Sequence, residues 1–383
     1  MRAFVFTDKS LERRAGQFVW LAIDTEKAQN APFKRRFPVD ALPTFFVIDS
    51  KTETAALRWV GGATVPQLQK ILEEGRSAAG SPRRGAEEIL ARADRLFAQN
   101  QNVEAALAYR EALAAAPAGW PRFDRALESL LYALDATHDE EGCARTARDA
   151  FARLSSTPSA ANVAATGLAC AVSMKKESPG REELIAALRA DALSVVRSGR
   201  ADLAADDVSA VYQALEQERD AAGDATGKKA LLEQHLSFLE RQAAAARTPE
   251  RRAVFDSHRL GASLELGQPE RAISMLEQSE KDAPDDYNPP ARLAMAYKAM
   301  KRWDAAAAAS DRALANAYGP RRIGILQTRA DIEAGRGDAA ASRRFLEEAL
   351  RSAESLPEGQ RSEKTIAGLK KKIEPRPAPT PAP

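Results

Sequence analysis

The stretch ARLAMAYKAMKRWDAAAAASDRALANA, residues 291–317, carries the pattern that decides the fold. Its middle, MKRWDAA, aligns with LGQPERA before it and AGRGDAA after it, so that Gly267, Lys301 and Gly335 follow one another at intervals of 34 residues. Ala272 and Ala306 repeat the same interval. A period of this length predicts a stack of helical hairpins, in which each repeat is one pair of helices. In the third copy we expect a slip of about two residues, because the helical run EEAL ends late, at Leu350.

Small and ring-bearing residues occupy the places that such hairpins require. Small side chains are needed where two antiparallel helices cross closely, and bulky ones fill the gaps between neighbouring hairpins. In residues 253–356 these places are held by Ala294, Tyr297 and Ala313, and in residues 85–117 by Ala93, Ala105, Tyr109, Ala112 and Pro117. Both stretches resemble tetratricopeptide (TPR) repeats, more strongly in 253–356 than in 85–117. The resemblance implies a mainly α-helical superhelix, an α-α solenoid.

The sequence between these two stretches also alternates helical runs with turns. Helices are predicted at 123–136, 141–154, 160–174, 181–197, 205–221 and 227–246. We interpret them as degenerate hairpins of the same superhelix, and irregular helical repeats are the alternative. The C-terminal run EPRPAPTPAP cannot continue a helix, so it is expected to be extended and mobile.

The N-terminal third has a different pattern, in which short apolar runs alternate with helical ones. Strands are predicted at 18–24, 44–48 and 53–62, because these runs are apolar and rich in β-branched or aromatic residues. Helices are predicted at 28–36 and at 64–75, the second with Thr64 as its N-cap and Gly75 at its end. The run RSAAGSPRRGAEE, residues 76–88, marks a linker.

This order of elements is similar to the C-terminal part of the thioredoxin fold. The resemblance is carried by AIDTE, PVDALPTFFVID and RWVGGATVPQLQKIL. It implies a cis-proline loop at Leu42, Pro43 and Thr44 that pairs with an extended peptide beside a dithiol. The family's first strand and its C-x-x-C motif are missing from this chain. Two explanations stay open, a start codon placed too late or a redox-dead remnant, and in both cases the chain as given lacks the dithiol needed for exchange.

Composition narrows the functional classes. The formal net charge of +2 leaves no strongly basic face for nucleic acid, and no run is long and apolar enough to span a membrane. Cys143 and Cys170 are expected to be small buried residues, although a bridge between them is possible. The three histidines have no partners at metal-ligand spacing, so no metal or other cofactor is predicted. The compartment stays open: cytoplasmic as written, periplasmic if a signal peptide lies upstream of Met1.

These observations predict a thioredoxin-like domain at 1–75, a linker at 76–84, repeats at 85–356 and a tail at 357–383. The leading hypothesis is a non-catalytic scaffold whose repeats hold a protein or peptide partner in a concave groove. Groove candidates come from the first helix of each hairpin: Arg92, Asn100, Arg292 and Lys298. The rival hypothesis is a thiol–disulfide oxidoreductase whose C-x-x-C lies upstream and whose repeats select substrates. The sequence does not indicate the oligomeric state.

Overall fold

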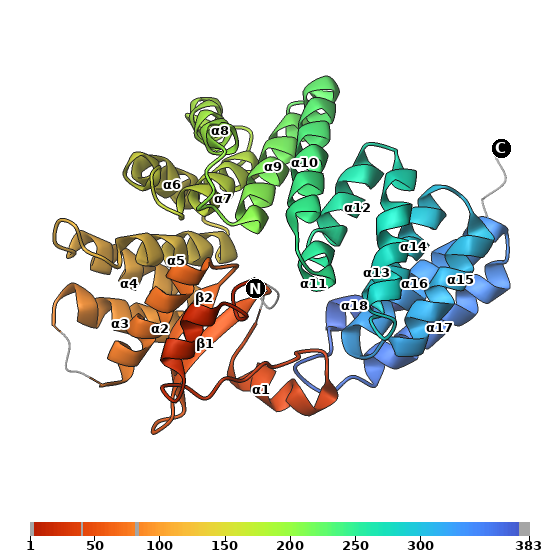
Figure 1. Cartoon of the computed structure of the whole chain (residues 1–383), viewed down its shortest axis with the longest axis horizontal. Helices are drawn as coiled ribbons and strands as arrows, with labels where there is room; N and C mark the ends of the chain where they lie inside the picture. The colour runs from red at the N-terminus through yellow and green to blue at the C-terminus, as the bar shows by residue number, and fades with distance from the viewer. Residues whose placement is uncertain (1–3, 40, 81–83, 375–383) are drawn as a thin grey trace, which may run out of the picture. The chain divides into compact units, whose positions relative to one another are not determined.

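The chain folds into two compact units that are dominated by α-helices. The computed structural model describes residues 4–39, 41–80 and 84–374, and within them it has 18 α-helices, three short 3-10 helices and two strands. Unit 1 consists of residues 1–19 and 37–242, and unit 2 of residues 20–36 and 243–383 (Figure 1). The chain therefore enters unit 2 twice, first with a short N-terminal segment and then with its C-terminal third.

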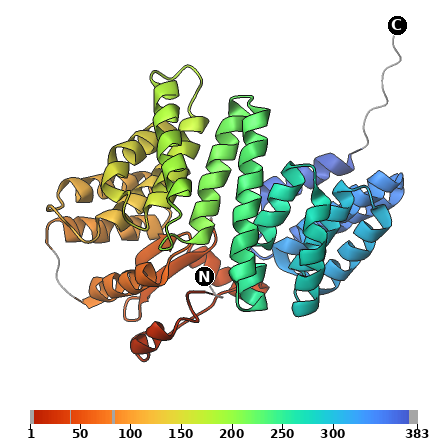
Figure 2. The same cartoon turned by 45° about the horizontal axis from the view of Figure 1, so that its top comes forward.

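Unit 1 contains eight consecutive helices that pack as antiparallel neighbours. Figures 1 and 2 show them following one another side by side. Their bounds are α3 Ala86–Ala98, α4 Asn102–Ala114, α5 Phe123–Ala136, α6 Glu140–Leu154, α7 Ala160–Ser173, α8 Arg181–Ser198, α9 Ala205–Ala221 and α10 Ala225–Ala245. The helices predicted between 123 and 246 are confirmed, each to within two residues. The 3.6-residue apolar period is a local signal, which explains this agreement.

Three turns of unit 1, between α3 and α4, α5 and α6, and α9 and α10, share one backbone geometry. Asn100, His138 and Gly223 have φ values of 62°, 57° and 70°, in the left-handed region. In each case the following N–H donates to a carbonyl five residues back, for example Gln101 N to Leu96 O at 2.9 Å. This arrangement satisfies the carbonyls that the end of a helix leaves unpaired, so each helix stops and the chain reverses.

Unit 2 also consists mainly of helical hairpins, with the 34-residue spacing expected from the sequence. Its helices are α11 Pro249–Ala253, α12 Asp256–Glu265, α13 Ile273–Asp282, α14 Asn288–Ala299, α15 Trp303–Asn316, α16 Gly319–Arg336, α17 Ala339–Glu354 and α18 Glu363–Ile373. Left-handed residues at three turns, Gly267, Lys301 and Gly337, correspond to the repeated turn of the sequence. The third turn thus lies two residues beyond Gly335, and the predicted slip is confirmed. Ala272, Ala294, Ala306 and Ala313 are all buried, as close helix crossings require.

The N-terminal part of unit 1 is a two-stranded hairpin with one helix. Strand β1, Thr44–Asp49, pairs antiparallel with β2, Thr54–Val60, and α2, Val65–Gly80, follows. The strands predicted at 44–48 and 53–62 are confirmed. The predicted strand at 18–24 is wrong, because no strand is assigned there and β1 and β2 form the only sheet in the described residues. Without a third strand this is a hairpin and not a thioredoxin fold.

Residues 18–24 depart from the prediction because a strand depends on partners far away in sequence. An apolar run forms a strand only where a neighbouring backbone completes its ladder. Trp20–Arg36 instead belong to unit 2, where 3-10 helix η2, Ala28–Asn30, leads into α1, Ala31–Arg36. The predicted helix at 28–36 is therefore confirmed, in a different setting.

Helix α2 shows why a glycine can be misinterpreted from sequence. Thr64 caps its start as predicted, because Gln67 N donates to Thr64 Oγ1 at 3.4 Å and Thr64 N donates to Gln67 Oε1 at 2.8 Å. The helix does not end at Gly75 but continues to Gly80. A Cβ at position 75 would lie 2.6 Å from the methyl groups of Val47, so Gly75 allows the helix to approach strand β1 closely.

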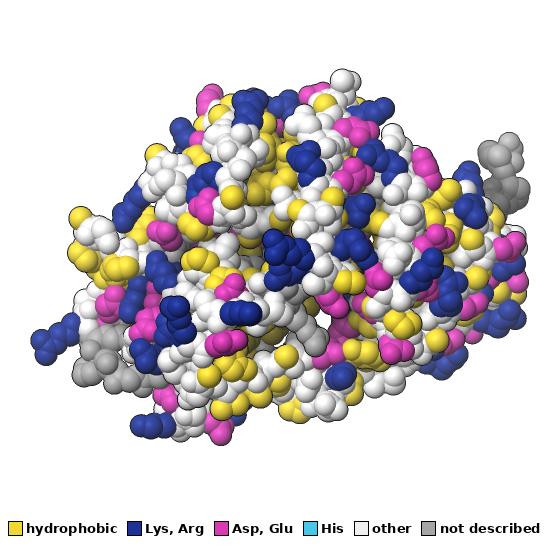
Figure 3. Space-filling view, in the orientation of Figure 1, with side chains coloured by type: hydrophobic (Ala, Val, Ile, Leu, Met, Phe, Trp, Pro, Cys, Tyr) yellow, Lys and Arg dark blue, Asp and Glu magenta, His cyan; other side chains and the backbone are white. Residues whose placement is uncertain are grey.

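Charged side chains of both signs are present on the surface. On the face shown in Figure 3, Lys and Arg side chains are interspersed with Asp and Glu, in agreement with the net charge of +2. None of the helices in the described part of the chain is long and apolar enough to cross a membrane. The Pro/Ala-rich end, residues 375–383, lies outside the described residues.

Candidate protein-interaction site

Unit 2 binds an N-terminal segment of its own chain, residues 20–36, which we name the strap. From Trp20 to Asp24 the strap has no regular secondary structure, and it then turns into η2 and α1. Asp24 shapes the turn, because its Oδ1 accepts a hydrogen bond from Glu26 N at 2.9 Å and its carbonyl accepts one from Asn30 Nδ2 at 2.8 Å. The turn presents the side chains of Asp24 and Glu26 to the C-terminal helices of unit 2.

Glu26 is bound at both carboxylate oxygens. Tyr287 donates its hydroxyl to Oε2 at 2.5 Å, and Arg321 donates Nε–H to Oε1 at 2.7 Å. Burial raises the pKa of Tyr287, and the hydrogen bond to Glu26 raises it further. The hydrogen bond to Glu26 also raises the pKa of Arg321. Both donors therefore keep their protons at neutral pH, as an anion-binding site requires.

Asp24 is bound by a second tyrosine. Tyr318 donates its hydroxyl to Asp24 Oδ2 at 2.6 Å, and this hydrogen bond raises the pKa of Tyr318 to about 12. The rings of Tyr287 and Tyr318 meet edge to face, with centroids 5.8 Å apart. Such pairs are a favoured aromatic geometry, so the two hydroxyls are held at a fixed spacing.

The main chain of the strap is bound as well. Gln360, which is buried, donates Nε2–H to the carbonyls of Thr25 and Lys27, each at 2.9 Å. A Cβ at Gly319 would overlap the carbonyl oxygen of Glu26, so the backbone of the strap can approach only because position 319 has no side chain. We name the residues of unit 2 that contact Asp24–Lys27, namely Tyr287, Tyr318, Gly319, Arg321 and Gln360, the tyrosine edge. The strap is also contacted further along, where Arg35 donates to the carbonyl of Glu358 and Gly359 lies close to Ala31 and Arg35.

Local sequence places the two tyrosines of the edge immediately before two helices, α14 and α16. Tyr287 precedes α14 and Tyr318 precedes α16, each followed two residues later by a proline in the first helical turn. Proline fits there because its missing N–H would have no partner in the helix. The positive ends of the helix dipoles also favour carboxylates at these positions. The repeated pattern Tyr-x-Pro, at 287–289 and 318–320, is the sequence signal that could have revealed the site.

Comparisons with known proteins find similarity to solved helical-repeat structures. The TPR2AB domain of yeast Sti1, in a structure titled as a complex with pHSP90, is 15% identical, with a TM-score of 0.29, over 75% of this chain and 98% of that one. BtubC from P. vanneervenii is 15% identical, with a TM-score of 0.34, over 78% of this chain and 98% of that one. No family model and no curated protein sequence matches the chain.

The four predicted groove residues lie in different environments. Arg92 pairs with Glu111 on the adjacent helix, and Lys298 Nζ lies 3.0 Å from Asp331 Oδ2. Asn100 is a turn residue whose Oδ1 accepts a hydrogen bond from Asn102. Arg292 lies beside the tyrosine edge: burial lowers its pKa, Asp256 opposes this shift, and Arg321 and Tyr287 are among the other groups that act on it. Binding by these four residues stays a prediction.

The predicted cis-proline loop is present as a local geometry. The Leu42–Pro43 peptide bond is cis, and the Leu42 side chain is 64% exposed. The carbonyl of Pro43 accepts a hydrogen bond from Gly61 N at 2.9 Å, and Thr44 Oγ1 donates to the carbonyl of Ala41 at 2.6 Å. Thr44 begins strand β1 opposite Val60. Peptide binding by Leu42, Pro43 and Thr44 stays a prediction.

A hydrogen-bonded Ser-His-Glu set joins helices α9 and α10. Ser209 Oγ lies 2.7 Å from His235 Nε2, and His235 Nδ1 lies 2.9 Å from Glu216 Oε1. The arrangement of serine, histidine and carboxylate resembles the catalytic triad of serine hydrolases. The spacing of the three residues along the sequence could not reveal this arrangement. However, Ser209 is 1% exposed and His235 2% exposed, so a substrate cannot reach the hydroxyl. We interpret the set as a polar link between two packed helices.

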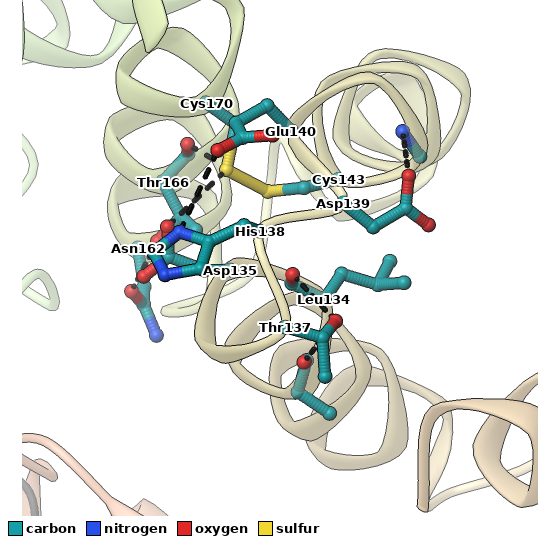
Figure 4. The surroundings of a disulfide bond; sticks show 12 residues. Leu134, Asp135, Thr137, His138, Asp139, Glu140, Cys143, Asn162, Thr166 and Cys170 are labelled. Atoms are coloured by element: carbon teal, nitrogen blue, oxygen red, sulfur yellow. Dashed lines mark hydrogen bonds and ion pairs between the residues drawn. A yellow bond between two sulfur atoms is a disulfide. The ribbon is translucent and has the colours of Figure 1, made fainter. Parts of the chain in front are cut away.

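The two cysteines form a disulfide between helices α6 and α7. Cys143 and Cys170 have Cα atoms 6.1 Å apart, and both are buried. Figure 4 shows the bridge beside the turn that holds Asp135 and His138. The sequence favoured two unlinked cysteines, but the antiparallel pairing of the helices brings the two positions together across 27 residues of chain. The described residues contain no free cysteine.

Proposed function

We propose that the chain is a non-catalytic protein-interaction scaffold whose helical hairpins hold extended segments of protein. The observation that supports this proposal most directly is the strap on the tyrosine edge. There the hairpins of unit 2 bind an irregular stretch of polypeptide through two of its side chains and two of its carbonyls. Recognition of extended segments by side chains projecting from a stacked array is the usual use of such repeats.

The oxidoreductase hypothesis receives no such support. Thiol–disulfide exchange needs an accessible thiolate, whereas Cys143 and Cys170 are bridged and are at most 1% exposed. The N-terminal hairpin of β1 and β2 also lacks the sheet of the fold on which that chemistry was expected. We therefore do not assign a redox role to the described part of the chain.

Site-specific photo-crosslinking in the native cell tests the scaffold proposal. Benzoylphenylalanine is placed at Leu107 or at Met295, whose side chains are 61% and 42% exposed, so the core is left intact. A scaffold should give discrete adducts to another protein at one or both positions, only after irradiation. The same residue at buried Leu131 is the matched control and should give none. If neither exposed position gives an adduct, the scaffold proposal is wrong.

A further inference from the structure

The tyrosine edge contacts the strap with the complementary hydrogen-bonding groups that a binding site offers to a ligand. At Asp24–Lys27 the polar contacts run from donors on the edge to acceptors on the strap: Tyr287 and Arg321 to Glu26, Tyr318 to Asp24, and Gln360 to two carbonyls. Further along the strap the direction reverses, because Arg35 Nη1 donates to the carbonyl of Glu358 at 3.3 Å. Donors arranged in this way select for acids two positions apart. The contacts of Gln360 add affinity for any main chain that follows the same path.

The chemistry of the edge excludes other segments. A neutral or basic side chain in place of Glu26 would leave the Arg321 guanidinium without its anion and would place no negative charge at the start of α16. A segment that lacked the turn made by Asp24 could not bring its carbonyls to Gln360. The occupant must therefore be acidic, with Asp-x-Glu spacing, and must turn immediately after the second acid.

The N-terminal flank of the strap is not anchored by apolar burial. Val19 and Leu21 are 88% and 70% exposed. Further along the strap, Ala31 on α1 is buried. The acidic turn itself, Asp24 and Glu26, is held by hydrogen bonds and ion pairs, whose net contribution is small because water competes for the same groups. A segment held in this way can be replaced by another that offers the same groups.

We propose that the tyrosine edge is a recognition site for acidic protein segments with Asp-x-Glu spacing, and that the strap is its intramolecular occupant. This inference rests on the proposed scaffold function and adds the class of partner. The strap competes at the effective concentration of a tethered ligand, about a millimolar. A free segment therefore binds the intact chain weakly, and it binds at least tenfold more tightly once the acids of the strap are removed.

The test measures binding of a fluorescein-labelled peptide of residues 20–36 to the full-length chain by fluorescence anisotropy. The receptor variants are the unaltered chain, D24A/E26A, D24A/E26A/Y287F/R321A, and D24A/E26A/R344A. Arg344 is an exposed arginine on α17 and serves as the matched control for loss of one positive charge. A peptide that carries Asn and Gln in place of Asp24 and Glu26 controls for non-specific binding.

The proposal expects D24A/E26A to bind the acidic peptide at least tenfold more tightly than the unaltered chain. Adding Y287F/R321A to D24A/E26A should weaken peptide binding at least tenfold. Adding R344A to D24A/E26A should change the affinity by less than twofold. Equal affinity for the two peptides, or no gain in D24A/E26A, would overturn the proposal. If D24A/E26A loses its helical circular dichroism, E26Q takes its place with the same expected order. If photo-crosslinking captures partner proteins but the peptide does not bind, this inference is wrong and the scaffold function stands. If the peptide binds but no partner protein is captured, only the scaffold function is wrong.

Discussion

Arg125 binds Asp94 at two points inside unit 1, with Nη1–Oδ1 at 2.8 Å and Nη2–Oδ2 at 3.0 Å. Arg125 Nε also donates to Glu74 Oε2 at 2.5 Å, and Tyr109 donates its hydroxyl to Asp94 Oδ1 at 2.8 Å. Burial by itself would lower the pKa of Arg125, but the two carboxylates outweigh it and raise the pKa. The guanidinium thus joins α2, α3 and α5 through groups that are all buried.

Replacing Arg125 with Met should destabilise unit 1 strongly. The change leaves Asp94 and Glu74 buried without their cation, and breaking a buried pair in this way costs about 3–5 kcal/mol. R92M is the matched control, because the Arg92–Glu111 pair is half-exposed and is worth at most about 1 kcal/mol. Urea unfolding followed by circular dichroism measures both variants. Equal losses of unfolding free energy would contradict the role assigned to Arg125.

The disulfide should contribute to stability through the unfolded state. A cross-link between residues separated by 27 positions lowers the conformational entropy of the unfolded chain. This loss raises the free energy of unfolding by about 3–4 kcal/mol. We expect C143A/C170A to lose an amount of this order in urea unfolding, and reductant to lower the midpoint of the unaltered chain but not of the variant. Intact mass measured without reductant should be lower by two hydrogen atoms than after reduction. An unchanged mass would show that the bridge does not form.

Two glycines of helix α16 should respond oppositely to alanine. A Cβ at Gly335 would lie 2.5 Å from the Trp303 ring, whereas a Cβ at Gly324 would meet nothing within 4 Å. G324A should therefore stabilise the helix by up to about 1 kcal/mol, since alanine is the better helix former. G335A should destabilise by about 1 kcal/mol or more, because the indole must move. Thermal unfolding of the two variants would contradict this explanation if both shifted in the same direction.

These examples separate what sequence could predict from what it could not. Helix α5 and its neighbours follow from a local apolar period, so their bounds were predicted closely. Gly335 repeats the turn spacing in sequence, yet its structural role depends on Trp303, which lies on another helix. The contact between the strap and the tyrosine edge could not be predicted from local sequence patterns, because Glu26 and Tyr287 are 261 residues apart. Short-range patterns carry no information on such pairs.

Two carboxyl groups of unit 1, buried Glu128 and half-buried Asp207, make stability depend on pH. Burial raises the pKa of Glu128 to about 7, although hydrogen bonds from Ser159 and Asn162 oppose this shift. Burial raises the pKa of Asp207 to about 7 as well, and neighbouring Asp206 adds to the shift. An acid with a raised pKa binds its proton more tightly in the folded state. The free energy of unfolding is therefore highest below the unfolded pKa, about 4, and falls as pH rises towards 7.

Replacing Asp207 with Asn should remove its part of this dependence. Asparagine stays neutral, so D207N should be more stable than the unaltered chain by on the order of 2 kcal/mol at about pH 8, where Asp207 must carry a charge. The gain should shrink towards zero at about pH 4, where the carboxyl is protonated in the folded state. D149N, at an exposed aspartate of α6, is the matched control and should show no such trend. Urea unfolding across this pH range measures the difference, and a gain that is equal at both ends would mean that Asp207 does not titrate as its burial requires.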